Sequence, residues 1–292
     1  MTLIIQTHKQ KIISAMSNPK FILDYDIFQE ALDSYEFFIN QITNLKSKGN
    51  NKVMDMVNYL NEYKDYLELE LMAKRGTPLL NRQKGQLKLD NSVIEEFLNY
   101  LLDPEIISNI PKDLYVGNKE AISQIYLNAN NVSKPQLLMD KKNYDFVVGK
   151  ELHMKLSFDN EYQKTNTMET KFILPIISGE CKTNFDKVMY MECSGIARSL
   201  KAGCPLSKYF IFVEFLDMAA KDLKLKEIDN IFLLRHAKRL TSKHRSLKYI
   251  VAQRLEYPID GKIFVKFVDL LRESFSESKN TSDMILKNGF IS

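Results

Sequence analysis

The chain has 292 residues, of which 41 are Lys or Arg and 37 are Asp or Glu, so its formal net charge is +4. Hydrophobic residues make up 45% and charged residues 27%, with only 10 Gly and 8 Pro, which excludes disordered, collagen-like and low-complexity chains. No apolar run approaches the roughly 20 residues that a transmembrane helix needs. The first residues also lack the apolar stretch of a secretion signal, so we expect a cytoplasmic protein without a membrane partner.

The three cysteines, Cys181, Cys193 and Cys204, are odd in number and form no C-x-x-C pair. This pattern does not indicate a disulfide framework or a structural zinc site, and it fits a reducing compartment. The sequence also lacks the glycine-rich motifs that bind ATP or dinucleotides, the H-E-x-x-H motif of zinc hydrolases and the G-x-S-x-G motif of serine hydrolases. These enzyme classes are therefore not supported.

The first part of the chain is predicted to be helical. Apolar residues recur at helical spacing over 25–45 and again over 52–72. The segment 74–86 contains two Gly and one Pro and predicts a break. We therefore expect a helical N-terminal region, residues 1–86, followed by the main domain, residues 87–292.

The middle of the chain changes from helical to strand-like patterning. Segments 144–158 and 171–183 are rich in Val, Ile, Phe and Leu and flank a polar stretch, which predicts two strands joined by a long hairpin loop. Helical spacing then runs over 185–200. The nearly continuous apolar run 208–218 predicts a strand that is buried on both faces.

Helices are predicted on both sides of this strand region. One begins at Asp90 or Asn91, whose side chains can cap it. After the last predicted strand the chain is expected to return to helices, with a basic segment over 235–254 and a further helix over 263–275. The order helix, strand, strand, helix, strand indicates an α/β fold.

Glu180 and Lys182 stand at the end of the second predicted strand, where they should point to the same face. Asp145 opens the preceding strand, so pairing of the two strands would bring it near Glu180. Two close carboxylates repel unless a cation lies between them, and oxygen ligands with open water positions suit Mg²⁺. The ammonium group of Lys182 could then orient a water or stabilise charge on a phosphate. An isolated Glu-x-Lys is most often a solvated surface pair, and it is the surrounding strands and helix that favour the functional interpretation.

This arrangement resembles the PD-(D/E)XK nuclease superfamily. The resemblance implies a restriction-endonuclease-like core, in which a mixed β-sheet is flanked by helices, and Mg²⁺-dependent cleavage of DNA. Asp145 matches the first acid of that motif, Glu180 the second acid and Lys182 the lysine. Tyr144, rather than Pro, precedes the aspartate, and the separation between the two acids is long. Asp159 is therefore a rival for the first acid, although it follows a strand and falls in the predicted loop.

Other acidic residues remain open. The family also uses an acid on the first core helix to bind or orient the metal, for which Glu95 is the first candidate and Glu96 the second. Both could instead be acids that only stabilise the positive end of the helix. Glu192 lies on the apolar stripe of its helix, where it would either face the cleft or extend to solvent.

The segments YDFVVGKEL, GECKTNFDKVM and MECSGIARSL resemble type II restriction endonucleases of the BbvCI-like kind. Those enzymes cut asymmetric sites with two related subunits. The resemblance implies a magnesium-dependent endonuclease that hydrolyses double-stranded DNA at a short specific sequence and works as a homodimer or a heterodimer. The alternatives are another nuclease of the superfamily and a DNA-binding partner subunit without cleavage activity. The recognition sequence does not follow from these residues.

The segment 235–254 concentrates positive charge in a chain that is otherwise nearly balanced. It holds seven basic residues and no acidic one: Arg235, Lys238, Arg239, Lys243, Arg245, Lys248 and Arg254. Such a segment can neutralise DNA phosphates and release their counterions. We expect the first five to contact DNA, and the alternative is a solvated helix face.

Overall fold

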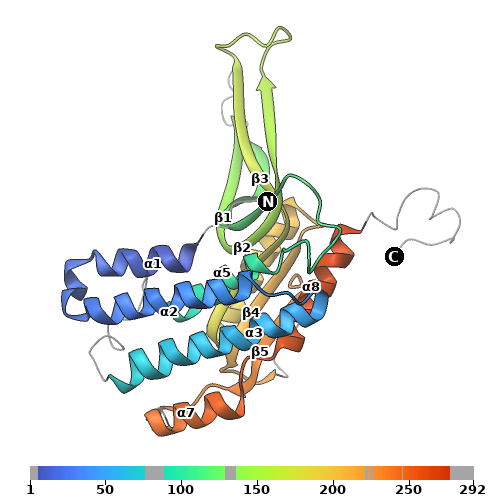
Figure 1. Ribbon diagram of the computed structural model, residues 1–292. Coiled ribbons are helices and arrows are strands. Elements are labelled where there is room, and N and C mark those ends of the chain that lie inside the picture. The colour runs from blue at the N-terminus through green and yellow to red at the C-terminus, as the bar shows by residue number, and fades with distance from the viewer. Residues whose placement is uncertain are drawn as a thin grey trace, which may run out of the picture.

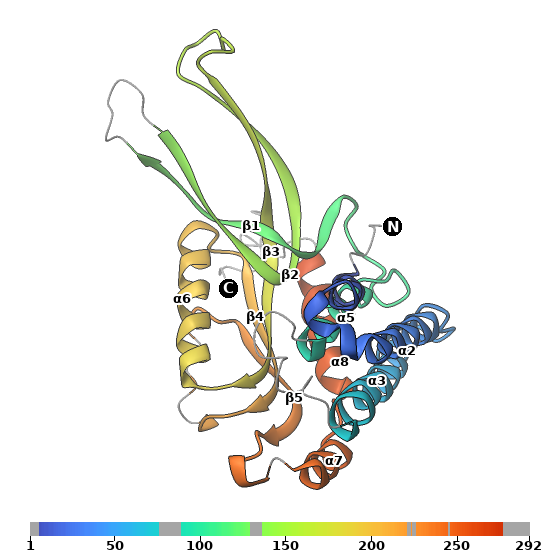
Figure 2. The ribbon, with the colours of Figure 1, turned by 90° about the vertical axis from the view of Figure 1, so that its left-hand side faces the viewer.

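The protein is described here by a computed structural model, which places a five-stranded sheet between two layers of helices (Figure 1). The described residues are 6–75, 89–128, 136–220, 223, 226–244 and 246–276. One large hydrophobic cluster joins one face of the sheet to five helices: α1 (Thr7–Met16), α2 (Tyr25–Thr43), α3 (Gly49–Asp65), α5 (Leu89–Tyr100) and α8 (Gly261–Phe275). A second cluster joins the other face to α6 (Lys187–Gly203), which lies alone on that side in Figure 2.

The sheet is mixed, as expected for this fold class. Its strands lie side by side in chain order: β1 (Leu114–Asn128), β2 (Gln136–Ser157), β3 (Thr167–Phe185), β4 (Lys208–Leu216) and β5 (Asn230–Lys238). The pairs β1–β2 and β2–β3 are antiparallel, whereas β3–β4 and β4–β5 are parallel. The connection from β3 to β4 passes through α6, because parallel neighbours need a crossover.

Several predicted elements are confirmed. The strands expected over 144–158 and 171–183 lie within β2 and β3, and the buried run 208–218 is β4. Strand β1 was not predicted, since the polar run Asn118, Lys119 and Glu120 interrupts its apolar residues and those near its end are exposed. The helical interpretation of the basic segment is wrong at its start, where Asn230–Lys238 forms β5. Phe232 and Leu234 of that strand are buried in the core. The basic residues that follow them, Arg235, His236 and Lys238, obscured the strand pattern.

The N-terminal helices pack as part of the main core. Helix α3 continues directly into the π-helix η2 (Tyr66–Lys74) and contacts α8 near the other end of the chain. The predicted break over 74–86 and the domain boundary at residue 86 fall almost wholly outside the described residues, so the division into two regions stays a prediction. None of the described helices combines the length and apolarity needed to cross a lipid bilayer.

Strand β2 belongs to two hairpins at once. Its beginning pairs with β1 and its end pairs with β3, and both hairpins project from the same end of the molecule and diverge (Figure 2). Between Gly117 and Lys119 the β1–β2 register shifts, so that Asp145 and Phe146 of β2 face the single residue Asn118. This is a β-bulge, which bends a strand and re-aims its side chains. Asp145 therefore lies where β2 changes direction.

A second irregularity follows immediately along β2. The β2–β3 register shifts between Val148 and Gly149. A Cβ atom at Gly149 would lie 2.5 Å from the carbonyl oxygen of Leu174, which is closer than any side chain tolerates. The glycine thus permits the close approach of the two strands beside the bend.

Candidate active site

The candidate site lies at the fork where β2 separates from β3. Backbone pairing of the two strands reaches Phe146 and Gly179, and β3 then continues alongside β4. At this point Oδ2 of Asp145 accepts a hydrogen bond of 2.9 Å from the backbone N–H of Cys181. A carboxylate thus takes the place of a strand carbonyl, which fastens Asp145 to β3.

Glu180 and Lys182 flank Cys181 on β3, so the structure brings all three residues of the predicted motif together. Glu180 is only 5% exposed, and its Oε2 accepts a hydrogen bond of 2.8 Å from Nζ of Lys182. Its other oxygen, Oε1, lies 3.4 Å from Nζ of Lys142 and makes no hydrogen bond with the described residues. A buried carboxylate oxygen without a hydrogen bond is costly and marks a place where a cation would be stabilised.

The two glutamates of helix α5 point in different directions. Glu95 is buried close enough to Asp145 for its charge to raise the pKa of that carboxyl group. Glu96 faces the helical layer, where it accepts hydrogen bonds of 2.5 Å from the Tyr35 hydroxyl and 2.8 Å from the backbone N–H of His8. Glu95 is therefore the acid of this helix that shares the site, and Glu96 anchors the helix to α1 and α2.

Asn91 ties helix α5 directly to the motif strand. Its Oδ1 accepts a hydrogen bond of 2.5 Å from the Thr183 hydroxyl, and its Nδ2 donates one of 3.4 Å to the backbone oxygen of Cys181. The sequence indicated Asn91 only as a helix cap. In the sequence, the only indication of this contact was the hydroxyl of Thr183, directly after Lys182. It could not be interpreted before α5 and β3 were known to touch.

The buried carboxylates of the site disfavour one another's ionised forms. Burial, followed by the charges of Glu95 and Glu180, raises the pKa of Asp145 to about 7. Burial lowers the pKa of Lys182, but the adjacent Glu180 outweighs it and raises this pKa above its usual range. Lys182 is therefore fully charged at neutral pH, whereas Asp145 needs a further cation to stay ionised.

The raised pKa of Asp145 predicts that the metal-free protein loses stability as the pH rises. Between about pH 4, where this carboxyl ionises in the unfolded chain, and about pH 7, the folded state keeps a proton that the unfolded state has released. The free energy of unfolding should therefore fall with pH in this window and level off above it. In EDTA at pH 8, Asp145→Asn should be more stable than the parent by about 4 kcal/mol, while at pH 4 the two should agree. Urea denaturation at both pH values measures this, and an equal pH dependence in the two proteins would contradict it.

Asp159, the rival first acid, is far from this site. It lies beyond Ser157, whose distance from Asp145 is twelve residues or about 40 Å of extended strand. Its carboxylate accepts backbone hydrogen bonds of 2.9 Å from Glu161 and 3.1 Å from Gln163, which shape the hairpin loop. Asp159 is thus a turn residue, and Asp145 is the aspartate beside Glu180.

Helix α6 presents a cysteine, not an acid, to the site. Glu192 is exposed to solvent, in agreement with the alternative in which it extends away from the cleft. Its neighbour Cys193 is fully buried and lies close enough for the charges of Lys182 and Glu180 to act on its pKa. Cys181 is buried on the opposite face of β3, among the core residues of the helical layer.

The basic segment divides into buried and exposed residues. Arg235 is fully buried and its Nε donates a hydrogen bond of 3.1 Å to Glu214, so its predicted contact with DNA is wrong. Arg254 is likewise buried, against Glu68. The other residues expected to contact DNA are Lys238 and Lys243, which are exposed, Arg239, which pairs with Asp217 at 2.7 Å, and Arg245, which lies outside the described residues.

No group of three or more His, Cys, Asp or Glu side chains in the described part of the chain is already arranged around a metal position. The donor set at the fork nevertheless fits a hard divalent cation. Asp145, Glu180 and Glu95 supply carboxylate oxygens, which are the ligands that Mg²⁺ prefers. One of these oxygens is buried without a hydrogen bond among the described residues, and Asp145 is destabilised by its anionic neighbours.

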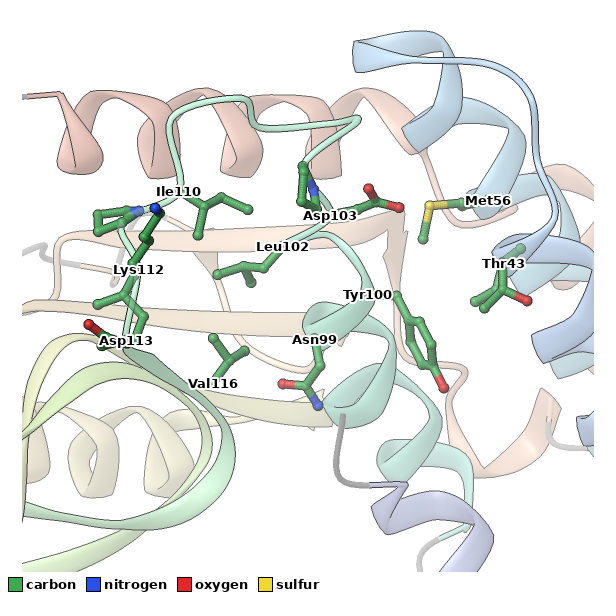
Figure 3. Close-up of a pocket in the computed structure, with 14 residues that line it drawn as sticks. Thr43, Met56, Asn99, Tyr100, Leu102, Asp103, Ile110, Lys112, Asp113 and Val116 are labelled. Carbon is green, nitrogen blue, oxygen red and sulfur yellow. The ribbon is translucent and has the colours of Figure 1, made fainter. Parts of the chain in front are cut away.

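A separate pocket of about 380 Å³ lies in the helical layer, between α2, α3, the end of α5 and the segment that leads to β1 (Figure 3). Figure 3 shows Met56 on one side and Leu102, Ile110 and Val116 on another, with Tyr100 near the middle. None of the three motif residues lines it. The pocket therefore belongs to the core packing of the helical layer and not to the fork.

Comparisons with known proteins agree with this fold. The family model described as the Bpu10I restriction endonuclease matches residues 86–291. A solved structure titled "native BbvCI A2B2 tetramer at low resolution" aligns with a TM-score of 0.67 over 94% of this chain and 97% of that chain, at 18% identity, which shows the fold. A search of curated proteins found no significant match. The chain belongs to the Bpu10I restriction endonuclease family, and it is therefore a type II site-specific deoxyribonuclease with a restriction-endonuclease-like fold.

Proposed function

We propose that this enzyme hydrolyses phosphodiester bonds of double-stranded DNA at a short specific sequence and that it requires Mg²⁺. The observation that carries the proposal is the hydrogen bond from the Cys181 backbone to Asp145, which holds that carboxylate beside Glu180 and Lys182. In a restriction endonuclease family, such a set of groups is suited to metal-assisted phosphodiester hydrolysis.

Asp145 and Glu180 would hold the metal, with Glu95 as a third ligand. When bound, the ion supplies Lewis-acid stabilisation of the charge that develops on the phosphate. The backbone hydrogen bond of Asp145 fixes one carboxylate against β3, and the contact of Asn91 with Thr183 fixes the helix that carries Glu95. The ligands therefore come from three elements that are fastened to one another, which is the preorganisation that a metal site needs.

Lys182 would act on the water and on the phosphate. Its ammonium group is charged at neutral pH and is held at 2.8 Å from Glu180. From there it can orient an attacking water by hydrogen bonding and stabilise the negative charge of the reacting phosphate. Deprotonation of Lys182 is opposed by its raised pKa, so its role is that of a positioning and electrostatic group and not of a general base.

Cleavage of plasmid DNA tests the proposal directly. With Mg²⁺ the protein should give discrete fragments, and with EDTA it should give none. If the isolated chain is inactive, a related subunit should restore cleavage, and Glu180→Gln in the mixed complex should then convert double-strand cuts into nicks. Unspecific degradation, or full activity of the mixed complex with Glu180→Gln, would overturn the assignment.

The exposed lysines of the basic segment are proposed to contact the DNA backbone. Lys238→Gln and Lys243→Gln should each weaken DNA binding equally for all sequences and reduce the slope of log K against log salt by about 1. Lys9→Gln is a matched control, since Lys9 lies on α1 and pairs with Glu36. Titration of a fluorescent duplex in EDTA at several salt concentrations measures the slope. An unchanged slope would remove this segment from the interface.

A second subunit is part of the proposal, because one active site cuts one strand. The solved structure with the same fold is titled a tetramer of two kinds of subunit. We propose that this chain likewise assembles with a copy of itself or with a related subunit on the DNA. A DNA substrate agrees with the expected cytoplasmic location.

A further inference from the structure

We infer that Lys11 and Lys142, two lysines outside the Glu-x-Lys motif, are exchangeable counter-charges: they hold Glu95 and Glu180 in the metal-free enzyme and leave when the divalent cation binds. The inference rests on the proposed function, since it assumes that the metal binds at these carboxylates. It assigns a role at the active site to a residue of the N-terminal helices, which precede the part of the chain that the family model matches.

Lys11 reaches the site from helix α1. Its Nζ lies 3.2 Å from Oε2 of Glu95. The Glu95 side chain is 7% exposed, whereas the Lys11 side chain is 33% exposed. The Glu95 carboxylate is therefore held in the interior, while the Lys11 side chain lies partly at the surface. Its ammonium group can move into water without disrupting any other helix or strand.

Lys142 makes the corresponding contact with Glu180. It stands on β2 three residues before Asp145, and its Nζ lies 3.4 Å from Oε1 of Glu180, the oxygen that makes no hydrogen bond with the described residues. Lys142 is 34% exposed, whereas Glu180 is 7% exposed by side chain. Lys182, by contrast, is 19% exposed and hydrogen-bonded to the same carboxylate. Lys142 is thus the looser of the two lysines that pair with Glu180.

When all three carboxylates are ionised, the formal charge of the site is neutral only with these two lysines in place. Three carboxylates, Asp145, Glu180 and Glu95, face three ammonium groups, those of Lys182, Lys11 and Lys142. A divalent cation added to this set would leave two positive charges in a largely buried site, which is unfavourable. The exchange of two lysines for one divalent cation keeps the charge balanced. Lys11 and Lys142 are the ones that can leave, since they are the more exposed, and the departing Lys142 becomes available to a DNA phosphate.

Binding of Mn²⁺ to the DNA-free protein tests the inference without any measurement of cleavage. The unbound ion is followed by electron paramagnetic resonance in the parent, in Lys11→Gln, in Lys142→Gln and in the double variant. Each single variant should bind Mn²⁺ about five-fold more tightly, and the double variant about twenty-fold, because a competing charge near the ligands is removed. Lys11→Arg keeps the charge and should bind like the parent.

The chain offers matched controls one or two residues away. Lys9 lies on the same helix as Lys11 and pairs with Glu36 at 2.8 Å, and Lys141 precedes Lys142 and pairs with Glu120 at 3.2 Å. Lys9→Gln and Lys141→Gln should leave the Mn²⁺ affinity within two-fold of the parent, since their partners are exposed glutamates. Thermal melting in EDTA verifies that each variant is folded.

The outcomes separate the inference from the proposed function. If Asp145→Asn abolishes Mn²⁺ binding while Lys11→Gln and Lys142→Gln bind like their controls or more weakly, the metal site stands and the counter-charge role is overturned. If Asp145→Asn binds Mn²⁺ as well as the parent, the metal site itself is wrong. Tighter binding in both lysine variants together with loss of binding in Asp145→Asn supports both.

Discussion

Asp145→Asn should lower the rate of DNA cleavage roughly 1,000-fold, which corresponds to about 4 kcal/mol of lost transition-state stabilisation. The amide is nearly the same size as the carboxylate, and its oxygen can still accept the hydrogen bond that the Cys181 backbone donates at 2.9 Å. The fold of the fork should therefore persist. What disappears is the negative charge that holds a divalent cation, so the variant should fail in catalysis rather than in folding.

The measurement is single-turnover cleavage of a saturating DNA duplex in Mg²⁺, with binding measured separately in EDTA. Asp159→Asn is the matched control, because Asp159 was the rival first acid and shapes only the hairpin loop. It should cleave within two-fold of the parent rate. Strong loss of activity in Asp159→Asn with retained activity in Asp145→Asn would reverse the assignment of the first acid.

Glu214→Gln should destabilise the protein by about 3 kcal/mol, the cost of removing one partner from a buried ion pair. Glu214 of β4 is almost fully buried between two cations. Its Oε1 lies 2.9 Å from Nζ of Lys64, and its Oε2 accepts a hydrogen bond of 3.1 Å from Nε of Arg235. The neutral amide would leave these buried cations with one counter-charge too few.

The network around Glu214 connects the sheet with helices from both ends of the chain. Lys64 also pairs with Glu68 at 2.8 Å, and Glu68 in turn pairs with Arg254 of α7 (Leu247–Glu256). Arg235 donates a further hydrogen bond of 3.1 Å to the backbone oxygen of Tyr257. The sheet, the N-terminal helices and helix α7 are thus joined through a network of buried charges, and the loss of one member should weaken the contacts of all three.

Urea denaturation measures the effect, with Glu169→Gln as the control. Glu169 pairs with Lys155 at 3.0 Å on the exposed β2–β3 hairpin, and removal of such a surface pair should cost no more than about 0.5 kcal/mol. A cost for Glu214→Gln as small as that of the control would show that the buried charges contribute little to stability.

The sequence predicted that Asp145, Glu180 and Lys182 lie together because its signals are local. Glu180 and Lys182 are two residues apart on an apolar strand, and Asp145 opens the preceding apolar run, so strand alternation and antiparallel pairing were enough to expect their convergence. The hydrogen bond between Asp145 and the Cys181 backbone could not be foreseen. It depends on the bulge in β2, and no residue in that segment signals the extra, unpaired position.

The prediction failed for residues whose environment is set by other elements of the fold. Arg235 stands in a run of basic residues, and such runs usually face solvent, but its partner Glu214 lies 21 residues earlier, on the neighbouring strand β4. Likewise Glu95 and Glu96 are adjacent residues of the same type, so the sequence alone does not distinguish their roles. They differ by about 100° around a helix, and only the position of β3 on one side and of α1 and α2 on the other decides which of them joins the site.

Strand β2 pairs with both β1 and β3, and this limits where residues can be inserted or deleted. One continuous strand, β2, forms one side of both projecting hairpins, and Asp145 lies at its bend. Loss or gain of one residue within this strand would turn every following side chain to the opposite face and rotate Asp145 away from its partners. The turn at 158–166, in contrast, lies beyond the last strand pair. Natural or engineered changes in length are therefore expected to collect at that tip and to be excluded from the strand that leads to it.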